Sequence, residues 1–229
     1  KENFYVFSCF FNCNTCTFPF GISFVLDGQQ YSYNGSTVRH YEENYCENLS
    51  IMDLKKILPT DGPPVEEVLK YVEKYKNEII VIKYGGNVFI DREIFDNFIK
   101  DLSVLNKLGL QVVVVHGGGP RIKRELSKQN IESKFVRGLR VTDEKIINVV
   151  ETVLIDFNED IVNSLKKIGT QAASLHTKKD NVIEIIPEQK ELGFVGIPDK
   201  INTETIIGKL KNNIIPVISP LGLGENKQT

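Results

Sequence analysis

Two apolar segments that end in glycine constrain the fold more than any other feature of this sequence. Residues 78–84 read EIIVIKY and are followed by Gly85 and Gly86, and residues 110–115 read LQVVVV and lead into the stretch HGGGP that begins at His116. Continuous runs of β-branched residues are typical of strands that are buried on both faces, as in a parallel sheet. Glycine lets the backbone turn sharply after such a strand and approach a ligand closely.

Helical patterns separate these strands. Apolar residues recur at i, i+3, i+4 and i+7 from Val65, which predicts an amphipathic helix over 65–76. By the same periodicity we expect helices over 91–108, 120–129 and 203–212, and one or two helices over 143–167 that are interrupted near Asn158. We expect further strands over 170–175, 181–186 and 214–219. The alternation predicts an α/β fold, with a mainly parallel sheet and helices on both faces.

Residues 1–60 have a different character. They are rich in aromatic, Asn and Ser residues, show little periodicity, and end near the turn signal DGPP at 61–64. We interpret 1–60 as a leader or irregular, flexible extension and 61–229 as one lobe. A targeting segment and an unstructured tail both fit the extension. Asn, Thr, Pro and Gly interrupt its apolar part, so a membrane-spanning helix is not predicted.

The cysteines predict no metal site. All four lie in the extension, and the spacing of Cys13 and Cys16 is that of half a zinc site, with no second CxxC to complete it. The net charge is −2, from 28 basic and 30 acidic residues. That balance gives no reason to expect nucleic acid or an anionic membrane as a partner. The net charge is still compatible with a small anionic ligand, because such a ligand needs only a local cluster of donors.

The two glycine clusters predict a site for such an anion. In open α/β sheets, ligands bind beyond the carboxyl ends of the strands. Successive backbone N–H groups after His116, together with a helix that begins at Pro120, would attract phosphate or carboxylate. Lys83 stands at the end of an apolar strand, where an ammonium group suits phosphoryl transfer. The alternative for the glycine cluster after His116 is a tight turn that serves packing. The alternative for Lys83 is an ordinary surface lysine at a strand end. No Walker A motif is present.

Arg140 is the second candidate cation. It lies in the stretch RGLRVTD, directly before a helix for which Thr142 is the expected cap, and an arginine there could hold a carboxylate in bidentate fashion. The alternative is a solvated loop arginine. We expect His116 to be structural, and Glu159 and Asp160 to lie on a solvated helix face.

Together these segments resemble the amino-acid kinase family and, within it, the N-terminal half of the N-acetyl-L-glutamate kinases. The resemblance runs from about residue 65 to residue 229. It is carried, in the family's order and spacing, by IVIKYGGN at 80–87, VVVVHGGGPRI at 112–122, FVRGLRVTDE at 135–144, ELGFVGIPDKIN at 191–202 and IIPVISPLGLGENKQT at 214–229.

The resemblance implies a kinase that transfers the γ-phosphoryl group of ATP, bound as MgATP, to the side-chain carboxylate of N-acetyl-L-glutamate in arginine biosynthesis. It implies a catalytic role for Lys83, substrate binding by Gly118, Gly119 and Arg140, and phosphate binding by Gly85, Gly86 and Gly117. It further implies a homo-oligomer, dimeric or hexameric, with arginine feedback inhibition linked to the helix over 65–76. The alternative for that helix is ordinary packing on the sheet. A plastid or mitochondrion is the favoured compartment, and the cytoplasm is the alternative.

The sequence also departs from this family. The family has about as much chain again beyond the point that matches Thr229, so we expect a fragment of a longer enzyme. The alternative is a non-catalytic N-acetylglutamate-binding or regulatory half-protein that pairs with a complete kinase. Within the chain, the stretch over 174–180 replaces a Gly-Leu-Ser-Gly-Lys-Asp-like segment, and Asn158-Glu159 replaces Asn-Lys.

Overall fold

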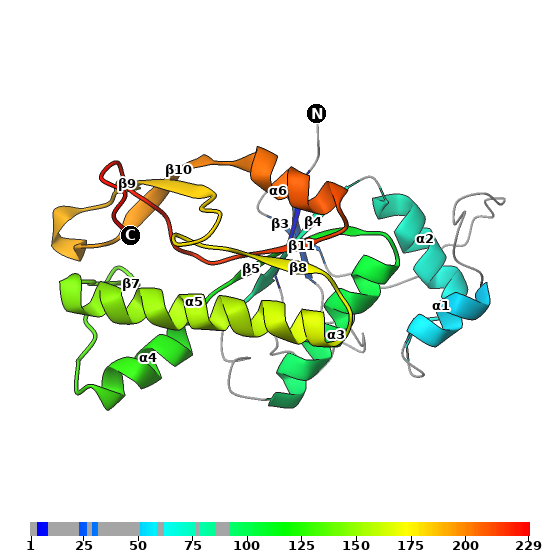
Figure 1. The fold of residues 1–229 in the computed structure, drawn as a ribbon, viewed down its shortest axis with the longest axis horizontal. Coiled ribbons are helices and arrows are strands. Elements are labelled where there is room, and N and C mark those ends of the chain that lie inside the picture. Colours follow the sequence, from blue (N-terminus) through cyan, green and yellow to red (C-terminus); the bar gives the residue numbers. More distant parts are fainter. Residues whose placement is uncertain are drawn as a thin grey trace.

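Four parallel strands form the centre of the molecule (Figure 1). The computed structural model describes residues 4–8, 23–26, 29–31, 51–58, 62–76, 78–85 and 92–229. The central strands lie in the order β4 (Ile79–Tyr84), β5 (Gln111–His116), β11 (Ile215–Ile218) and β8 (Ala172–Leu175). Lys83 pairs with Val115 and Tyr84 with His116, so β4 and β5 end level with each other. The two glycine clusters therefore follow adjacent strand ends.

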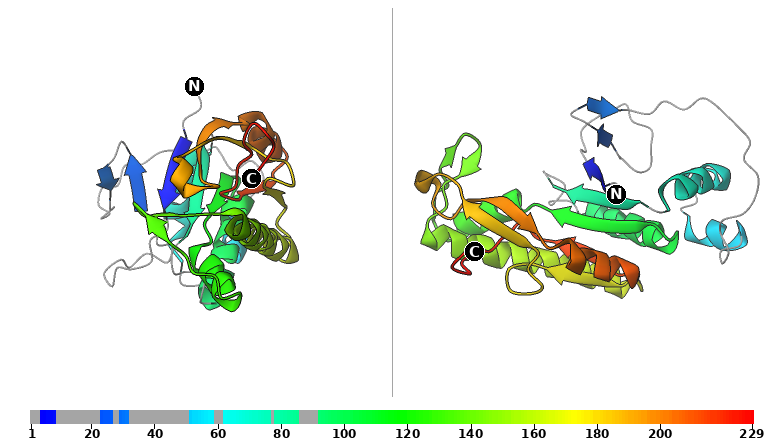
Figure 2. Two further views of the ribbon diagram at one scale, coloured as in Figure 1. Left: turned by 90° about the vertical axis from the view of Figure 1, so that its left-hand side faces the viewer. Right: turned by 90° about the horizontal axis from the view of Figure 1, so that it is seen from above.

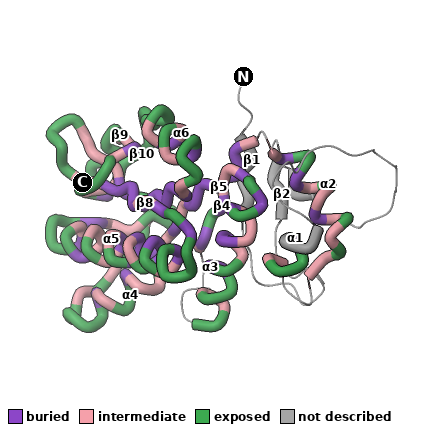
Figure 3. Tube along the Cα trace, turned by 45° about the vertical axis from the view of Figure 1, so that its right-hand side comes forward, coloured by how far each residue is buried: buried purple, intermediate pink, exposed green. Residues whose placement is uncertain are grey.

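Helices cover both faces of this sheet, which confirms the predicted fold class. On one face, α3 (Arg92–Lys107) and α5 (Glu144–Lys167) pack on Ile80, Ile82 and Tyr84 of β4. On the other face, α6 (Thr203–Lys211) packs on Ile79 and Val113. Alternate residues of one strand thus enter two different cores, because successive side chains point to opposite faces. Figure 3 shows the buried positions gathered along β4, β5 and β8.

The described parts of residues 1–60 contain three short strands and one helix. β1 (Phe4–Ser8) pairs in parallel with β4, and β2 (Ser23–Leu26) and β3 (Gln29–Tyr31) continue the sheet in antiparallel fashion. Helix α1 (Ile51–Ile57) follows, and its Leu54 is buried with Val68 and Val72 of α2 (Val65–Tyr75). The sequence did not predict these strands, because their residues lack a clear alternation. The contacts of β1 with β4 and of α1 with α2 cross residue 60, where the sequence places a domain boundary. That boundary stays a prediction.

Helix α5 corrects one expectation. It runs unbroken from Glu144 to Lys167, whereas the sequence suggested an interruption near Asn158. Asn158 is 0% exposed and its amide contacts the ends of two strands. A polar residue in the middle of the helix thus faces inward to a buried partner and does not mark a break.

Two hairpins stand outside the central sheet. β6 (Phe135–Val136) pairs with β7 (Leu139–Arg140), and β9 (Ile183–Pro187) pairs with β10 (Gly196–Ile201), both antiparallel. A 3-10 turn, η2 (Lys190–Leu192), precedes β10. Figures 1 and 2 show β7, β9 and β10 at one end of the molecule and α1 and α2 at the other.

For residues 1–60 the sequence predicts neither a membrane-spanning helix nor a cysteine metal site. Of the helices that the structure describes, none combines the length and the apolarity needed to cross a membrane. The four cysteines lie outside the described residues.

The amino end of α5 supports a first test. The Asp143 carboxylate accepts a hydrogen bond of 2.8 Å from the backbone N–H of Ile146, so it satisfies one free donor of the first turn. We expect Asp143→Ala to lower the free energy of unfolding by about 1 kcal/mol in urea denaturation, and Asp143→Asn, which keeps the acceptor, to lower it by less. Equal stability of the alanine variant and the wild type would contradict this role.

Candidate functional site

The ends of β4 and β5 are joined directly. The backbone N–H of Gly117 donates to the Tyr84 carbonyl at 2.8 Å, one residue beyond the last paired position of β5. Gly85 follows Tyr84 and is half-buried, and a Cβ placed on it would lie 3.7 Å from Cε of Lys83. The Lys83 side chain therefore passes close to the first glycine turn. Gly86 lies outside the described residues.

Lys83 is the exposed residue of a strand whose other members are buried or half-buried. It shares a face with Ile79 and Val81, which pack toward α6. Within the described residues, its ammonium group forms no ion pair. A cation that is held at a strand end without a carboxylate partner can bind an anionic ligand without first breaking a salt bridge.

The second glycine turn opens the amino end of α4 (Gly119–Lys128). Gly118 occupies the N-cap position, and no side chain caps this helix. Gly119 is exposed, and a Cβ placed on it would meet no atom within 4 Å. The first N–H groups of a helix lack partners inside the helix, and here the open space at Gly119 lies beside them. This end of α4 has the arrangement that binds phosphate or carboxylate elsewhere.

The three glycines of this turn differ in what they do. A Cβ on Gly118 would lie 2.4 Å from Cδ2 of the buried Leu154, so Gly118 lets the start of α4 pack closely on α5. The N–H of Gly117 is already engaged in the sheet with Tyr84. Gly117 was expected to bind phosphate, but the structure leaves it no free N–H for that purpose. Gly119 is the member whose surroundings are open.

Arg140 comes from the β6–β7 hairpin, at the same end of the sheet (Figure 1). Its Nη1 donates to Oγ of Ser133, and its guanidinium group lies 4.7 Å from the centre of the Phe135 ring. Partial burial lowers the pKa of Arg140 from its ordinary value. No carboxylate of the described residues forms an ion pair with it. Its described contacts are with its own hairpin and not with the glycine turns.

A buried chain of contacts holds the base of this hairpin. The Thr142 hydroxyl donates to the Arg140 carbonyl at 2.9 Å, and the Thr142 backbone pairs with Leu192 and Phe194. Gly193 has φ 69, and a Cβ on it would lie 2.2 Å from the Thr142 carbonyl oxygen. The segment around Gly193 therefore fixes the strand that carries Arg140. Thr142 had been expected to cap α5, and Asp143 does so instead.

His116 is buried between the turn and α5. It is 1% exposed, with Nδ1 2.9 Å from the Gly117 carbonyl and Nε2 3.1 Å from Nδ2 of Asn158. Burial, the largest cause, lowers the pKa of His116 to about 4. The neutral ring that fits these partners donates from Nδ1 and accepts at Nε2. Both nitrogens are engaged, which agrees with the structural role expected for this residue.

Arg121 was missed by the sequence reasoning. Its Nη1 lies 2.7 Å from Oδ2 of Asp160, and its guanidinium carbon lies 4.1 Å from the centre of the Phe157 ring. The pair ties the first turn of α4 to α5. Asp160 is exposed on the helix face, as expected, and in addition pairs with Arg121. No local pattern could have revealed a contact between residues so distant in the sequence.

The two departures from the family pattern contact each other. The Glu159 carboxylate lies 3.4 Å from Nζ of Lys179 and 3.7 Å from Nε2 of His176. About two turns earlier in α5, Glu151 accepts from Lys178 at 2.8 Å and from Thr177 at 3.0 Å. The altered turn after β8 is therefore tied to α5 by charged pairs, and Glu159, like Asp160, has partners.

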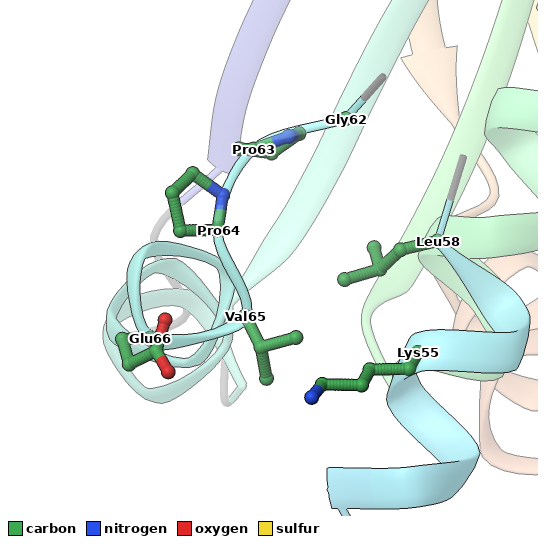
Figure 4. Close-up of a pocket in the computed structure, with 7 residues that line it drawn as sticks. All are labelled: Lys55, Leu58, Gly62, Pro63, Pro64, Val65 and Glu66. Carbon is green, nitrogen blue, oxygen red and sulfur yellow. The ribbon is translucent and has the colours of Figure 1, made fainter. Parts of the chain in front are cut away.

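One cavity lies far from these groups. It measures about 390 Å³ and is situated between the end of α1 and the start of α2 (Figure 4). Its lining comprises Lys55, Leu58, Gly62, Pro63, Pro64, Val65 and Glu66. Figures 1 and 2 show α1 and α2 at the end of the molecule away from β7, so the cavity lies at the opposite end from the β6–β7 hairpin.

Comparison with known proteins assigns most of this chain to one family. The sequence model of the amino acid kinase family matches residues 78–229, which include both glycine turns and Arg140. The chain belongs to the amino acid kinase family. Similar curated proteins named acetylglutamate kinase include those of Pelagibacter ubique, 50% identical over 177 residues, and Petrotoga mobilis, 40% identical over 166 residues. These alignments cover 77% and 71% of this chain and 62% and 56% of the relatives, so the chain spans little more than half of their length.

Solved structures show the same fold. The protein smu.665 of Streptococcus mutans is 28% identical, with a TM-score of 0.58 over 65% of this chain and 60% of that one. An N-acetylglutamate synthase of Neisseria gonorrhoeae, complexed with coenzyme A and N-acetyl-glutamate, has a TM-score of 0.62 over 71% of this chain and 38% of that one. Its identity is 19%, so this likeness concerns the fold alone.

Gly193 offers a test of the support beneath Arg140. We expect Gly193→Ala to lower the free energy of unfolding by about 2 kcal/mol or more, because alanine resists a positive φ and its Cβ would strike a backbone oxygen. Gly208→Ala is the matched control: Gly208 lies within α6, and a Cβ there would meet no atom within 4 Å. That change should stabilise the protein by about 0.5–1 kcal/mol. Equal effects of the two substitutions in urea denaturation would contradict this role of Gly193.

His116 predicts a pH dependence. Its folded pKa of about 4 lies below the ordinary 6.5, so the folded state favours the neutral ring and unfolding takes up a proton. This contribution is complete above pH 6.5 and is lost as the pH falls toward 4. We expect it to remove about 2 kcal/mol of stability between pH 8 and pH 5, a loss absent from His116→Gln. The same change in stability between these pH values for both proteins would disprove it.

Proposed function

We propose that this chain forms the substrate-binding part of an acetylglutamate kinase, and that the whole enzyme phosphorylates the side-chain carboxylate of N-acetyl-L-glutamate with ATP. One observation carries the proposal. Two cations without carboxylate partners in the described residues, Lys83 and Arg140, stand with an uncapped helix end at one end of a parallel sheet. The 50% identity to a relative named acetylglutamate kinase supports this choice of substrate.

The chemistry suits a site without a general base. A carboxylate is ionised at neutral pH, so no proton has to be removed before it attacks. A carboxylate oxygen forms a bond to the γ-phosphorus of ATP, the bond from that phosphorus to the β–γ bridging oxygen breaks, and ADP leaves with the electron pair. The product is an acyl phosphate. His116, whose two ring nitrogens are engaged, is therefore not needed for proton transfer.

Each group of the site then has a defined task. The Lys83 ammonium stabilises the negative charge on the transferring phosphoryl group. Gly85 and Gly86 let the backbone approach that group. The open start of α4 at Gly119, set in place by Gly118, offers backbone N–H donors to the substrate, and Arg140 binds its other carboxylate. Catalysis by positioning and charge stabilisation needs no covalent intermediate.

The residues of this site suit one part of ATP, its transferring phosphate. Lys83 and the first glycine turn suit the transferring phosphate of ATP. The described residues contain no cluster of three or more carboxylate, imidazole or thiol groups that could hold a metal ion. We infer that Mg²⁺ enters as MgATP, held by the phosphates, where it neutralises their charge.

Further proposals concern the pathway, the assembly and the location of the enzyme. We place the enzyme in arginine biosynthesis and expect a homo-oligomer with arginine feedback inhibition. The apolar face of α2 packs on Leu54 and Leu108, which favours the alternative of an ordinary packed helix at this position. Dimer, hexamer, arginine sensitivity and a plastid or mitochondrial location stay predictions, as does the view that the chain is part of a longer enzyme.

The proposal is tested by trapping the product. With MgATP and N-acetyl-L-glutamate, the enzyme that contains this chain should form an acyl phosphate. Hydroxylamine then displaces phosphate from it and gives the hydroxamate of N-acetyl-L-glutamate, which is measured. Lys83→Ala should lower that rate by about 100-fold or more, because it removes a charge that acts in the transition state. Its calorimetric Kd for N-acetylglutamate should change far less. Lys167→Ala, an exposed lysine at the other end of α5, is the control and should leave both unchanged.

The outcomes separate the two functions considered for this chain. Binding of N-acetylglutamate without hydroxamate formation would support a non-catalytic binding module. Full activity of Lys83→Ala would remove the lysine from its role. Absence of calorimetric binding at millimolar N-acetylglutamate would refute both functions.

A further inference from the structure

The β6–β7 hairpin is built to a fixed register. Its two turn residues, Arg137 and Gly138, have φ 51 and φ 81, and positive φ at both positions is the mark of a type I′ turn. Such turns match the twist of the flanking strands and hold them in one pairing. Phe135 is thereby placed opposite Arg140, and the hydrogen bond of 2.9 Å from the Val141 N–H to the Lys134 carbonyl continues the pairing.

Phe135 contributes little to the core. It is 58% exposed, the most exposed of the large apolar side chains that the structure describes. Residues directly opposite on two antiparallel strands share a face and are close enough to interact. The Arg140 guanidinium lies 4.7 Å from the ring centre, within the range of a cation–π contact. The described contact of Phe135 is therefore with the cation and not with the hydrophobic clusters.

Arg140 is held on two sides without being neutralised. Ser133 accepts a hydrogen bond from Nη1, and the Phe135 ring covers the guanidinium group. Neither neighbour carries a charge that competes with an anionic ligand. An arginine side chain has many rotamers, and ordering them on binding costs free energy. A guanidinium that is already ordered loses less of that freedom when a carboxylate arrives.

We propose that Phe135 is a positioning residue for Arg140, which it orders in advance to receive the carboxylate of the substrate. This inference rests on the proposed function, because it takes a carboxylate as the ligand of Arg140. It adds a residue that sets the affinity for that ligand and does not touch the transferred phosphoryl group. Phe135 therefore affects Kd and KM for N-acetylglutamate and leaves kcat and KM for ATP unchanged.

The test compares substitutions within this one hairpin. Phe135→Leu removes the aromatic face but keeps an apolar side chain, and Phe135→Tyr keeps the face. Leu139→Ala is the matched control, because Leu139 is 43% exposed and pairs with Val136, one position away from the Phe135–Arg140 pair. Phe135→Leu should weaken calorimetric binding of N-acetylglutamate by about five-fold, the equivalent of one exposed cation–π contact. Phe135→Tyr and Leu139→Ala should bind as the wild type does, and all three should share its Tm.

Arg140→Lys separates this inference from the proposed function. If Arg140→Lys loses binding while Phe135→Leu binds normally, the positioning role is overturned and the proposed function stands. If Leu139→Ala weakens binding as much as Phe135→Leu does, the effect belongs to the hairpin as a whole, which also overturns the positioning role. If wild type and Arg140→Lys bind equally well, Arg140 does not hold the carboxylate, and its assignment fails together with that of Phe135. Weakening by Phe135→Leu alone, with recovery in Phe135→Tyr, supports the inference.

Discussion

The buried amide of Asn158 joins the strand ends that carry the second glycine turn. Its Nδ2 lies 3.1 Å from Nε2 of His116 and donates to the Val217 carbonyl at 2.9 Å, so one side chain of α5 joins the ends of β5 and β11. His116 in turn contacts the Gly117 carbonyl. The Asn158 nitrogen and both ring nitrogens of His116 thus find partners, as deeply buried polar atoms usually do, whereas Oδ1 of Asn158 is buried without one. Asn158, in the middle of a long helix, thus helps to fix the position of the second glycine turn through His116.

Phe157, the neighbour of Asn158, extends this support. Its ring meets the edge of the His116 ring at 5.0 Å between centres, and the Arg121 guanidinium stacks at 4.1 Å. Tyr84, at the end of β4, stacks on Phe98 of α3 at 4.0 Å and lies 6.1 Å from Phe157. The residues just before both glycine turns are therefore anchored in one aromatic cluster. Rigid support of this kind is what a site that works by positioning requires.

The glycines divide into those that serve packing and those that leave room for a ligand. Gly118 and Gly193 allow backbone to approach Leu154 and Thr142, and Gly222 likewise lies where a Cβ would be 2.4 Å from Ile185. Gly119 has open space instead. Gly193 and Gly222 thus serve packing between segments of the chain. They brace the hairpins that stand over the carboxyl end of the sheet.

The sequence by itself determined the α/β class, most element positions, and the two glycine turns, with Lys83 just before the first of them. These features follow from local periodicity and from the conformational needs of glycine. Asn158 was misread as a break, and Arg121 and Phe135 went unnoticed. Only the tertiary structure decided what those residues do, because their partners lie across the fold or across a hairpin whose register depends on two positive φ angles. Local sequence carries backbone preference. Which charges remain unpaired, and so free to bind an anion, is set by long-range packing.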